Sequence, residues 1–316
     1  MKPILIMNYP FPKKWIASIS LQSHFDLVFV KNRKQLLKKI SKADALITLL
    51  TEKIDKELLS KAKKLKAIGN YAVGVDNIDL KLCSEKKIIV LNTPDVLTNA
   101  TAELTLGLFL ATARRFTEGS EHCIKKKFKR WSPELLLGKE IADSSVVLVG
   151  KGRIGQSVAK KLTALGAQVK FITKTTSLKT QAVLLKNADF LSLHLPYNKN
   201  NHHWLNKKKL SLLSEKAIVI NTSRGPLIDE KALIWALQNK DIFAAGLDVF
   251  ENEPRIPNSL LKLKNVFLLP HLGSATELTR YNMFYLVARG VVALFSGQLP
   301  TNRVTLNSNS GRPKGT

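Results

Sequence analysis

A glycine-rich turn between a buried strand and an amphipathic helix restricts the possible folds of this 316-residue chain more than any other segment. The apolar run 145–149 leads into Gly150-Lys-Gly-Arg-Ile-Gly155, and a helical pattern follows. Gly150 permits a tight turn, Gly152 lets a diphosphate approach the backbone, and Gly155 lets the helix pack on the strand. The N-terminus of that helix offers free amide groups to phosphate oxygens. The segment therefore predicts a dinucleotide site formed by Gly150, Gly152, Arg153, Ile154 and Gly155.

Short apolar runs alternate with lysine-rich amphipathic stretches along the chain, which is typical of parallel βαβ units. The first series of expected strands comprises residues 3–7, 28–30, 45–47, 67–68 and 88–90. The second series comprises residues 146–149, 169–172, 190–195, 217–221, 244–249 and 266–269. Six runs with intervening helices are enough for a doubly wound sheet, so the chain is predicted to be an α/β protein with parallel sheets.

Two long apolar helices, expected near residues 100–115 and 276–296, flank the second series of strands. A helix at each end of one unit indicates that the chain passes from one domain to the other at the first helix and returns at the second. We therefore expect a discontinuous domain of residues 1–99 and 276–304 and an inserted domain of residues 100–275. The polar residues 305–316 are expected to form a disordered tail.

The chain is strongly basic, with 50 Lys and Arg against 24 Asp and Glu and a formal net charge of +26. Such a surplus can attract nucleic acid or acidic ligands. The lysines are scattered over many segments, however, and no arginine-rich arm or helix-turn-helix pattern accompanies them. We interpret the charge as a property of solvated helix faces and do not expect nucleic acid as a partner.

Cysteine and histidine usage favours a reduced compartment and no metal site. Cys83 and Cys123 are the two cysteines, and they form no CxxC pair. The N-terminal apolar run is too short for a signal peptide, and no run is long enough to span a bilayer, so the sequence predicts a cytoplasmic protein without membrane contact. Five histidines are interpreted as structural or surface residues, namely His24, His122, His194, His202 and His203.

The end of the second strand of the inserted domain bears on the choice of cofactor. An acidic residue at this point commonly binds the ribose 2′-hydroxyl of NAD, but here the sequence is Thr173-Lys174-Thr-Thr. Hydroxyl groups and a lysine accommodate a 2′-phosphate, which a carboxylate would repel. The chain is expected to bind NADP or NAD, with NADPH favoured.

Seven segments in the same order resemble the D-isomer-specific 2-hydroxyacid dehydrogenase family, and within it glyoxylate reductase and hydroxypyruvate reductase in particular. The similarity covers nearly the whole chain. It implies a Rossmann-type nucleotide domain inserted in a flavodoxin-like substrate domain, and a homodimer formed largely by the nucleotide domains. The segments are residues 51–55, 70–79, 92–103, 150–155, 221–225, 246–254 and 270–273.

The resemblance implies three catalytic residues, each in a motif at or just past the carboxyl end of an expected strand. They are Arg224 in Asn-Thr-Ser-Arg-Gly, Glu253 before Pro254, and His271 after Pro270. Histidine titrates near working pH and can protonate the oxygen of a carbonyl that is being reduced. A glutamate paired with it stabilises the imidazolium, and an arginine can hold a substrate carboxylate with its planar fork.

The same resemblance implies further contacts to cofactor and substrate. Thr222, Ser223 and Asp248 lie in motifs that face the cofactor. The backbone amides of Val73 and Gly74 are expected to contact the substrate carboxylate, and Leu50 is expected to line a pocket for a small oxo acid. For Leu49 and Leu50, a position in the core of the small domain is the open alternative.

Some features depart from the family pattern or leave the activity open. The stretch between Thr173 and Asp189 is short, so a helix that flanks the adenine is expected to be trimmed or missing, and Lys151 and Asn201 replace commoner residues.

The predicted activity is NAD(P)H-dependent reduction of glyoxylate or hydroxypyruvate. One alternative is a 3-phosphoglycerate dehydrogenase. The other, supported by the basic charge, is a dinucleotide-sensing corepressor or nucleic-acid-binding protein.

Overall fold

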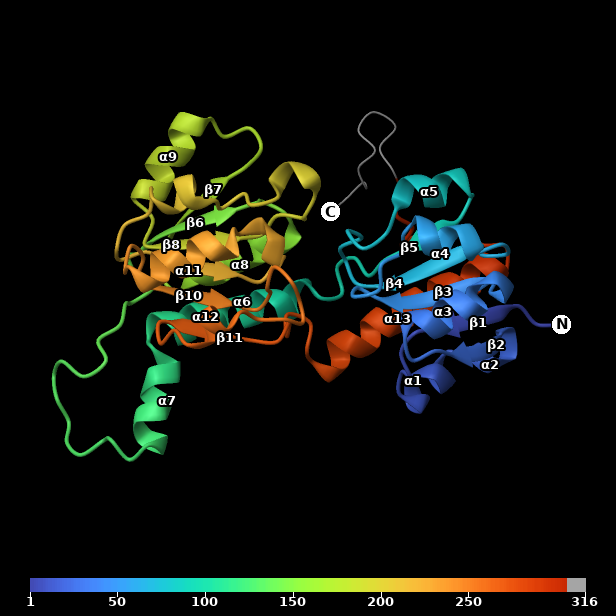
Figure 1. The fold of residues 1–316 in the computed structure, drawn as a ribbon, viewed down its shortest axis with the longest axis horizontal. Coiled ribbons are helices and arrows are strands. Elements are labelled where there is room, and N and C mark those ends of the chain that lie inside the picture. The colour runs from blue at the N-terminus through green and yellow to red at the C-terminus, as the bar shows by residue number, and fades with distance from the viewer. Residues whose placement is uncertain (306–316) are drawn as a thin grey trace. The chain divides into compact units, whose positions relative to one another are not determined.

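A computed structural model describes residues 1–305, which form two compact α/β units (Figure 1). Unit 1 consists of Met1–Leu97 and the described residues 276–305, and unit 2 of Thr98–Ala275. The sequence places the first division between residues 99 and 100, whereas the structure has it between Leu97 and Thr98. All but the first residue of the expected tail, residues 306–316, lies outside the described chain.

The sheet of unit 1 has five parallel strands in the order β2-β1-β3-β4-β5. This 2-1-3-4-5 order is that of flavodoxin-like sheets, as the family resemblance implies. Each expected run of the first series contributes one strand. The strands are β1 (Ile4–Met7), β2 (Asp26–Phe29), β3 (Ala45–Leu49), β4 (Ala67–Tyr71) and β5 (Ile89–Leu91).

Helices bury both faces of this sheet, because successive residues of each strand point to opposite sides. Alternate residues such as Ile6 and Leu46 pack against α3 (Arg33–Lys39), α4 (Lys56–Lys61) and α5 (Leu80–Glu85). Leu5, Met7 and Ile47 face the other way and meet Phe284 and Val287 of the long helix α13. The helices of this second layer are α1 (Lys13–Ser18), α2 (Leu21–His24) and α13 (Glu277–Phe295).

Unit 2 contains a six-stranded parallel sheet in the order β11-β10-β9-β8-β6-β7. Its strands coincide with the six expected runs of the second series. They are β6 (Ser145–Val149), β7 (Gln168–Ile172), β8 (Phe190–Leu193), β9 (Ile218–Asn221), β10 (Ala244–Leu247) and β11 (Val266–Leu268). Because all six run in one direction, their carboxyl ends and the loops that follow lie along the same edge.

Two apolar layers again enclose this sheet. One face carries α6 (Thr98–Ala113) and α8 (Arg153–Ala164), whose buried residues include Phe109 and Val158. The other face carries shorter helices that share a core with Val147, Leu191 and Val219. They are α9 (Leu178–Lys186), α10 (Lys207–Leu210), α11 (Glu230–Gln238) and α12 (Asn258–Leu261).

The connection between β7 and β8 is short, as the sequence predicts. Here a helix is expected to be trimmed or missing, and the stretch holds one helix, α9, which is nine residues long and begins with the Ser177 side chain accepting a hydrogen bond from the Thr180 amide. Counted from β6, the strand order is 2-1-3-4-5-6, whereas a Rossmann sheet is ordered 3-2-1-4-5-6. Within residues 1–305 no strand lies outside β7, because the chain passes from β7 through α9 directly to β8.

Helix α7 (Phe116–Ile124) and the loop to Gly138 extend away from the sheet of unit 2 (Figure 1). We call residues 116–138 the arm. Unlike the other α-helices of the unit, α7 buries no residue. Large apolar side chains of the arm are exposed instead, namely Phe116, Ile124, Phe128, Trp131, Leu135 and Leu137. Of the helices in residues 1–305, none is both long and apolar enough to cross a membrane.

Candidate active site

Three neighbouring loops at the carboxyl edge of the unit 2 sheet carry the predicted catalytic residues. Arg224 follows β9 and precedes the 3-10 turn Gly225–Leu227. Glu253 lies in the loop after β10, and His271 follows β11. Since β9, β10 and β11 are adjacent in the sheet, the strand order alone places these loops side by side.

His271 and Glu253 form a hydrogen-bonded pair. The Nδ1 atom of His271 lies 2.8 Å from Oε2 of Glu253, and the other carboxylate oxygen accepts a hydrogen bond of 3.0 Å from the Phe250 amide. Burial favours a raised pKa for Glu253, but the hydrogen bond and charge of His271, the Phe250 amide and the charge of Arg224 together lower it. The carboxylate therefore stays ionised at neutral pH and can stabilise a positive imidazolium ring.

A close backbone contact brings the Arg224 loop against the loop of Glu253. A Cβ atom at Gly225 would overlap the carbonyl group of Phe250, so a residue with a side chain does not fit there without moving one loop. The Asn221 side chain shapes the same turn: its amide donates to the Arg224 carbonyl over 2.9 Å, and its oxygen accepts from the Ser223 amide over 3.0 Å. Sequence analysis did not assign these roles to Asn221 and Gly225, although both lie in the quoted motif.

Asp248 lies beneath His271 and holds the turn that presents it. Its carboxylate accepts hydrogen bonds from the amides of Leu272 (2.6 Å) and Gly273 (2.8 Å), while its carbonyl accepts from the His271 amide (2.9 Å). His271 has a φ of 56°, a left-handed conformation that is uncommon for residues other than glycine. These three bonds satisfy the amides of the turn and keep His271 in that conformation.

The glycine-rich turn has the space that a dinucleotide requires. Gly150 has a φ of 107°, and a Cβ there would overlap the carbonyl of His194. A Cβ at Gly155 would overlap the Gly150 carbonyl, so both glycines are explained by contacts inside the protein. A Cβ at Gly152 would meet no described atom within 4 Å. Nothing in the described chain requires glycine at this position, whereas close approach of a pyrophosphate does, so the turn fits a dinucleotide.

Comparisons with known proteins identify the family of the chain. Residues 106–273 match the model of the D-isomer specific 2-hydroxyacid dehydrogenase NAD-binding domain. The chain is 40% identical to glyoxylate reductase of Thermococcus litoralis, over 99% of this chain and 100% of the relative. This chain belongs to the D-isomer-specific 2-hydroxyacid dehydrogenase family. It is accordingly an NAD(P)-dependent dehydrogenase that reduces 2-oxo acids.

Solved structures extend the comparison. A Thermus thermophilus protein superposes with a TM-score of 0.88 at 38% identity, covering 95% of this chain and 99% of that one. An NADPH-dependent glyoxylate/hydroxypyruvate reductase of Sinorhizobium meliloti, solved with NADP and malonate, also has a TM-score of 0.88, at 29% identity and with 100% of both chains covered. The cofactor of this dehydrogenase is therefore NAD or NADP, which the glycine-rich turn of unit 2 accommodates.

The other predicted cofactor residues surround the same edge of the dehydrogenase's sheet. Arg153 and Ile154 begin helix α8. The buried Thr222 hydroxyl lies 2.8 Å from the Thr105 hydroxyl of α6, and the Ser223 hydroxyl donates to the Leu195 carbonyl over 2.5 Å. These bonds attach the loop after β9 to neighbouring elements, so both hydroxyls have a structural role.

Thr173 and Lys174 follow β7. The Thr173 amide donates to the Thr176 hydroxyl over 2.9 Å, and the hydroxyls of Thr173 and Thr175 are 2.9 Å apart, while Lys174 is exposed. The turn therefore presents hydroxyl groups and an ammonium group together.

The predicted substrate residues of the dehydrogenase lie after adjacent strands of unit 1. The half-buried Leu50 follows β3, whereas Leu49 packs against the core. Val73 and Gly74 follow β4, and their carbonyls accept hydrogen bonds of 2.8 and 2.7 Å from Asn92 and Asn70. The two buried asparagines hold the loop that contains the predicted amide donors, a role that sequence analysis did not assign.

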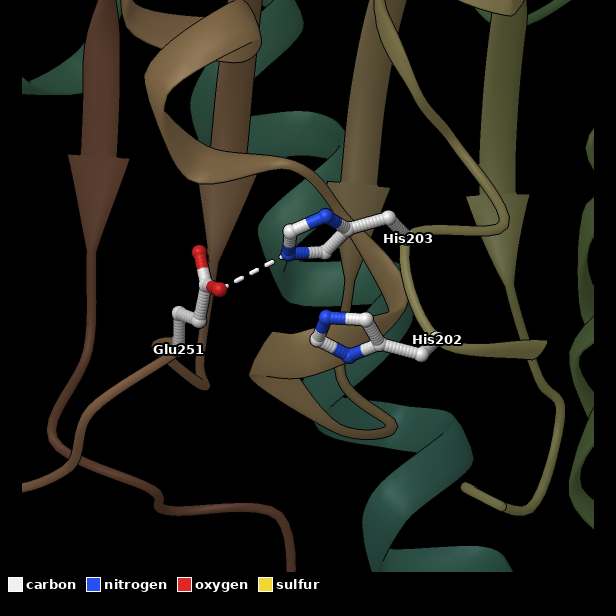
Figure 2. Close-up of side chains that lie close together, drawn as sticks. All are labelled: His202, His203 and Glu251. Atoms are coloured by element: carbon white, nitrogen blue, oxygen red, sulfur yellow. Dashed lines mark hydrogen bonds and ion pairs between the residues drawn. The ribbon is translucent and has the colours of Figure 1, made fainter. Parts of the chain in front are cut away.

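Three histidines of unit 2 lie outside the predicted catalytic trio but make defined contacts. His194 is structural, as expected: it is buried, its Nε2 atom lies 2.9 Å from the Ser192 hydroxyl, and burial lowers the pKa of its imidazole to about 4. His203 has a carboxylate partner that sequence analysis did not identify. Its Nε2 atom lies 2.7 Å from Oε1 of Glu251, and His202 stacks on it (Figure 2). Sequence analysis missed this group because Glu251 is 48 residues away along the chain.

Replacement of Asp248 tests whether it positions His271. In Asp248→Asn, an amide group would face a backbone amide, so we expect the free energy of unfolding of the cofactor-free protein to fall by about 1–3 kcal/mol, with lower turnover. Chemical denaturation and steady-state kinetics measure both. If Asp248 only contacted the cofactor, its replacement would instead weaken cofactor binding and leave the stability of the cofactor-free protein unchanged.

Proposed function

We propose that this dehydrogenase reduces glyoxylate or hydroxypyruvate to the corresponding 2-hydroxy acid, with His271 as the general acid. The observation that carries the proposal is the 2.8 Å pair between His271 and Glu253, with the charge of Arg224 acting on the same carboxylate. When bound, the reduced nicotinamide supplies the hydride. The residues of this chain supply the proton and bind the 2-oxo acid substrate.

The Glu253 carboxylate determines what His271 can do. Its contact with Nδ1 keeps a proton on that nitrogen, so Nε2 is the atom that carries the transferable proton. In the direction of reduction, the Nε2 proton moves to the carbonyl oxygen as that oxygen gains negative charge. The ionised Glu253 stabilises the imidazolium before the transfer, and in the reverse direction the neutral ring accepts the proton.

A 2-oxo acid also carries a carboxylate, which needs a partner. The guanidinium of Arg224 can bind two oxygens at once and suits the carboxylate together with the carbonyl oxygen. Val73 and Gly74 are proposed to add backbone amide donors, and Leu50 an apolar contact that favours a compact substrate. This residue set suits a small acid because it contains one cationic group for one carboxylate.

Removal of the imidazole tests the role of His271. We expect His271→Ala to lower kcat about 10²- to 10⁴-fold, the usual contribution of a general acid, with an unchanged dissociation constant for the cofactor. Steady-state kinetics and fluorescence titration of the reduced cofactor measure the two quantities. His24→Ala, which removes an exposed histidine of unit 1, is the control and should retain full activity. Activity in His271→Ala close to that of the unaltered enzyme would refute the assignment.

A panel of substrates tests the proposed substrates, glyoxylate and hydroxypyruvate, against the alternative of 3-phosphohydroxypyruvate. We expect kcat/KM to be at least about tenfold higher for glyoxylate or hydroxypyruvate than for pyruvate or the phosphorylated acid, because a doubly charged phosphate lacks a second cationic partner in the proposed residue set. Cofactor oxidation, followed at equal concentrations of the four acids, gives the ratios. A preference for the phosphorylated acid would favour a 3-phosphoglycerate dehydrogenase instead.

We also propose that NADPH is the preferred cofactor. The turn after β7 contains hydroxyl groups and Lys174 but no acid, and Lys151 adds a second exposed ammonium near the same strand, with Nζ 5.4 Å from the centre of the Phe171 ring. Two lysine side chains, with no carboxylate in the turn, favour a ribose that carries a 2′-phosphate over one with a free 2′-hydroxyl.

An acid at the end of β7 should reverse this preference. Thr173→Asp places a carboxylate that repels the 2′-phosphate and can bind the ribose hydroxyls, so we expect the ratio of kcat/KM for NADPH to that for NADH to fall at least about tenfold. Thr163→Asp, which adds the same charge at the exposed end of α8, controls for net charge. A clear NADH preference in the unaltered enzyme would contradict the proposal.

We propose in addition that the dehydrogenase is a homodimer and that the arm of unit 2 forms part of its interface. Trp131 is 76% exposed and Ile124 75%, and such a group of apolar side chains on an extended segment is unusual for a monomer.

A cytoplasmic location is also proposed, because both cysteines are free thiols, as a reducing compartment would keep them.

Charges placed on the arm test the dimer. We expect Trp131→Asp combined with Phe128→Asp to shift the mass measured by light scattering from two chains to one, because burying two carboxylates at an apolar contact is costly. Leu178→Asp, which alters an apolar side chain that is 79% exposed on α9, should leave the mass unchanged. A monomeric unaltered protein at micromolar concentration would refute the proposal.

A further inference from the structure

Two histidines and a glutamate meet on unit 2, apart from the pair of His271 and Glu253. His202 and His203 follow the 3-10 turn Lys199–Asn201 in the loop after β8, and Glu251 lies in the loop after β10. The two imidazole rings are stacked, with centroids 3.8 Å apart, and both lie beside Glu251 (Figure 2). One potential ligand atom from each of the three residues lies within 4.8 Å of the others.

Backbone hydrogen bonds fix the segments that hold these side chains. The His203 amide donates to the Pro226 carbonyl over 2.8 Å, and the Leu205 amide donates to the Leu227 carbonyl over 2.9 Å. Across the cluster, the Glu230 amide donates to Oε2 of Glu251 over 3.3 Å. The loops after β8, β9 and β10 are thereby tied together, so the three donors are held near one another before any ligand binds.

Neighbouring groups also orient the donor atoms. The Tyr197 hydroxyl lies 3.3 Å from Nδ1 of His202, and a proton on that nitrogen leaves the Nε2 lone pair of His202 available. Oε1 of Glu251 faces Nε2 of His203, while Oε2 is occupied by the Glu230 amide. Contacts of this kind to the far side of a ligand are typical of metal sites in proteins.

The local charge favours a cation. Glu230 is buried, and its carboxylate lies against the same loop, with Oε2 accepting a hydrogen bond of 3.4 Å from the Glu251 amide. Two neighbouring carboxylates in a partly buried place repel each other, and a divalent ion bound to one of them relieves that repulsion.

We propose that Nε2 of His202, Nε2 of His203 and the Glu251 carboxylate bind one divalent transition-metal ion of the zinc class. Two imidazoles and one carboxylate suit Zn²⁺, Co²⁺, Ni²⁺ or Cu²⁺, whereas Mg²⁺ and Ca²⁺ prefer oxygen ligands alone. Three protein ligands leave a fourth, tetrahedral position for water.

The rearrangement that the ion requires is small. Metal bonds of about 2.0–2.1 Å at a tetrahedral angle separate two ligand atoms by about 3.3 Å, so the 2.7 Å contact between His203 and Glu251 opens by roughly half an ångström. His202 is exposed, and its ring turns out of the stack to direct Nε2 at the ion.

The ion would join the loop after β8 to the loop after β10, two residues before Glu253. Because it binds the folded chain and not the unfolded one, it adds to stability as its concentration rises.

Metal titration of the full chain, after chelator treatment, tests the proposal. We expect Zn²⁺ to bind with one ion per chain and a micromolar or lower dissociation constant by calorimetry, and Co²⁺ to produce the visible absorption of a tetrahedral complex. His202→Ala is the decisive variant, because the hydrogen bond between His203 and Glu251 does not need His202. It should weaken Zn²⁺ binding at least tenfold, with an unchanged melting temperature in the presence of chelator, and Glu251→Gln should weaken binding as well.

Two controls separate this cluster from other histidines. His24→Ala removes an exposed histidine elsewhere, and His271→Ala removes the second histidine paired with a glutamate, so both should bind Zn²⁺ as the unaltered chain does. Absence of saturable binding to the unaltered chain, or binding that is the same in His202→Ala, would overturn the proposal. None of these measurements depends on turnover, so they are independent of the proposed substrate.

Discussion

The parallel alignment of the strands in unit 2 is the constraint on which the active site depends. Six strands that run in one direction bring every loop that follows a strand to a single edge. Arg224, Glu253 and His271 are separated by up to 47 residues along the chain, yet they follow β9, β10 and β11, which are neighbours in the sheet. The hydrogen bonds between the strands thus bring the three loops together, and local contacts then fix the positions of the side chains.

Two local contacts refine this arrangement. The absence of a side chain at Gly225 lets the Arg224 loop touch the backbone of Phe250, and the Asp248 carboxylate holds the turn of His271. Burial raises the pKa of Asp248 to about 6, against the opposing effect of the two backbone amides and of the charge of His271. Burial thus disfavours the charged form of Asp248, while the amides of the turn that it holds favour that form.

Much of this architecture can be predicted from the sequence, because parallel strands and glycine-rich turns leave local patterns. The eleven strand runs and the positions of α6 and α13 agree with the structure to within a few residues. Contacts that depend on three-dimensional proximity could not be predicted. The bonds from the Asp248 carboxylate to the turn of His271, which is 23 residues further along the chain, leave no local pattern in the sequence. The pairing of His203 with Glu251 was missed for the same reason.

The strand order gives part of the basic charge a physical role. Because no described strand lies outside β7, this strand is an edge with peptide groups that a second sheet could extend. Along β7 the side chains of Gln168 and Lys170 are exposed, and an ammonium group in the middle of an edge strand hinders the approach of another strand. At least one lysine of this very basic chain thus protects the protein against edge-to-edge aggregation.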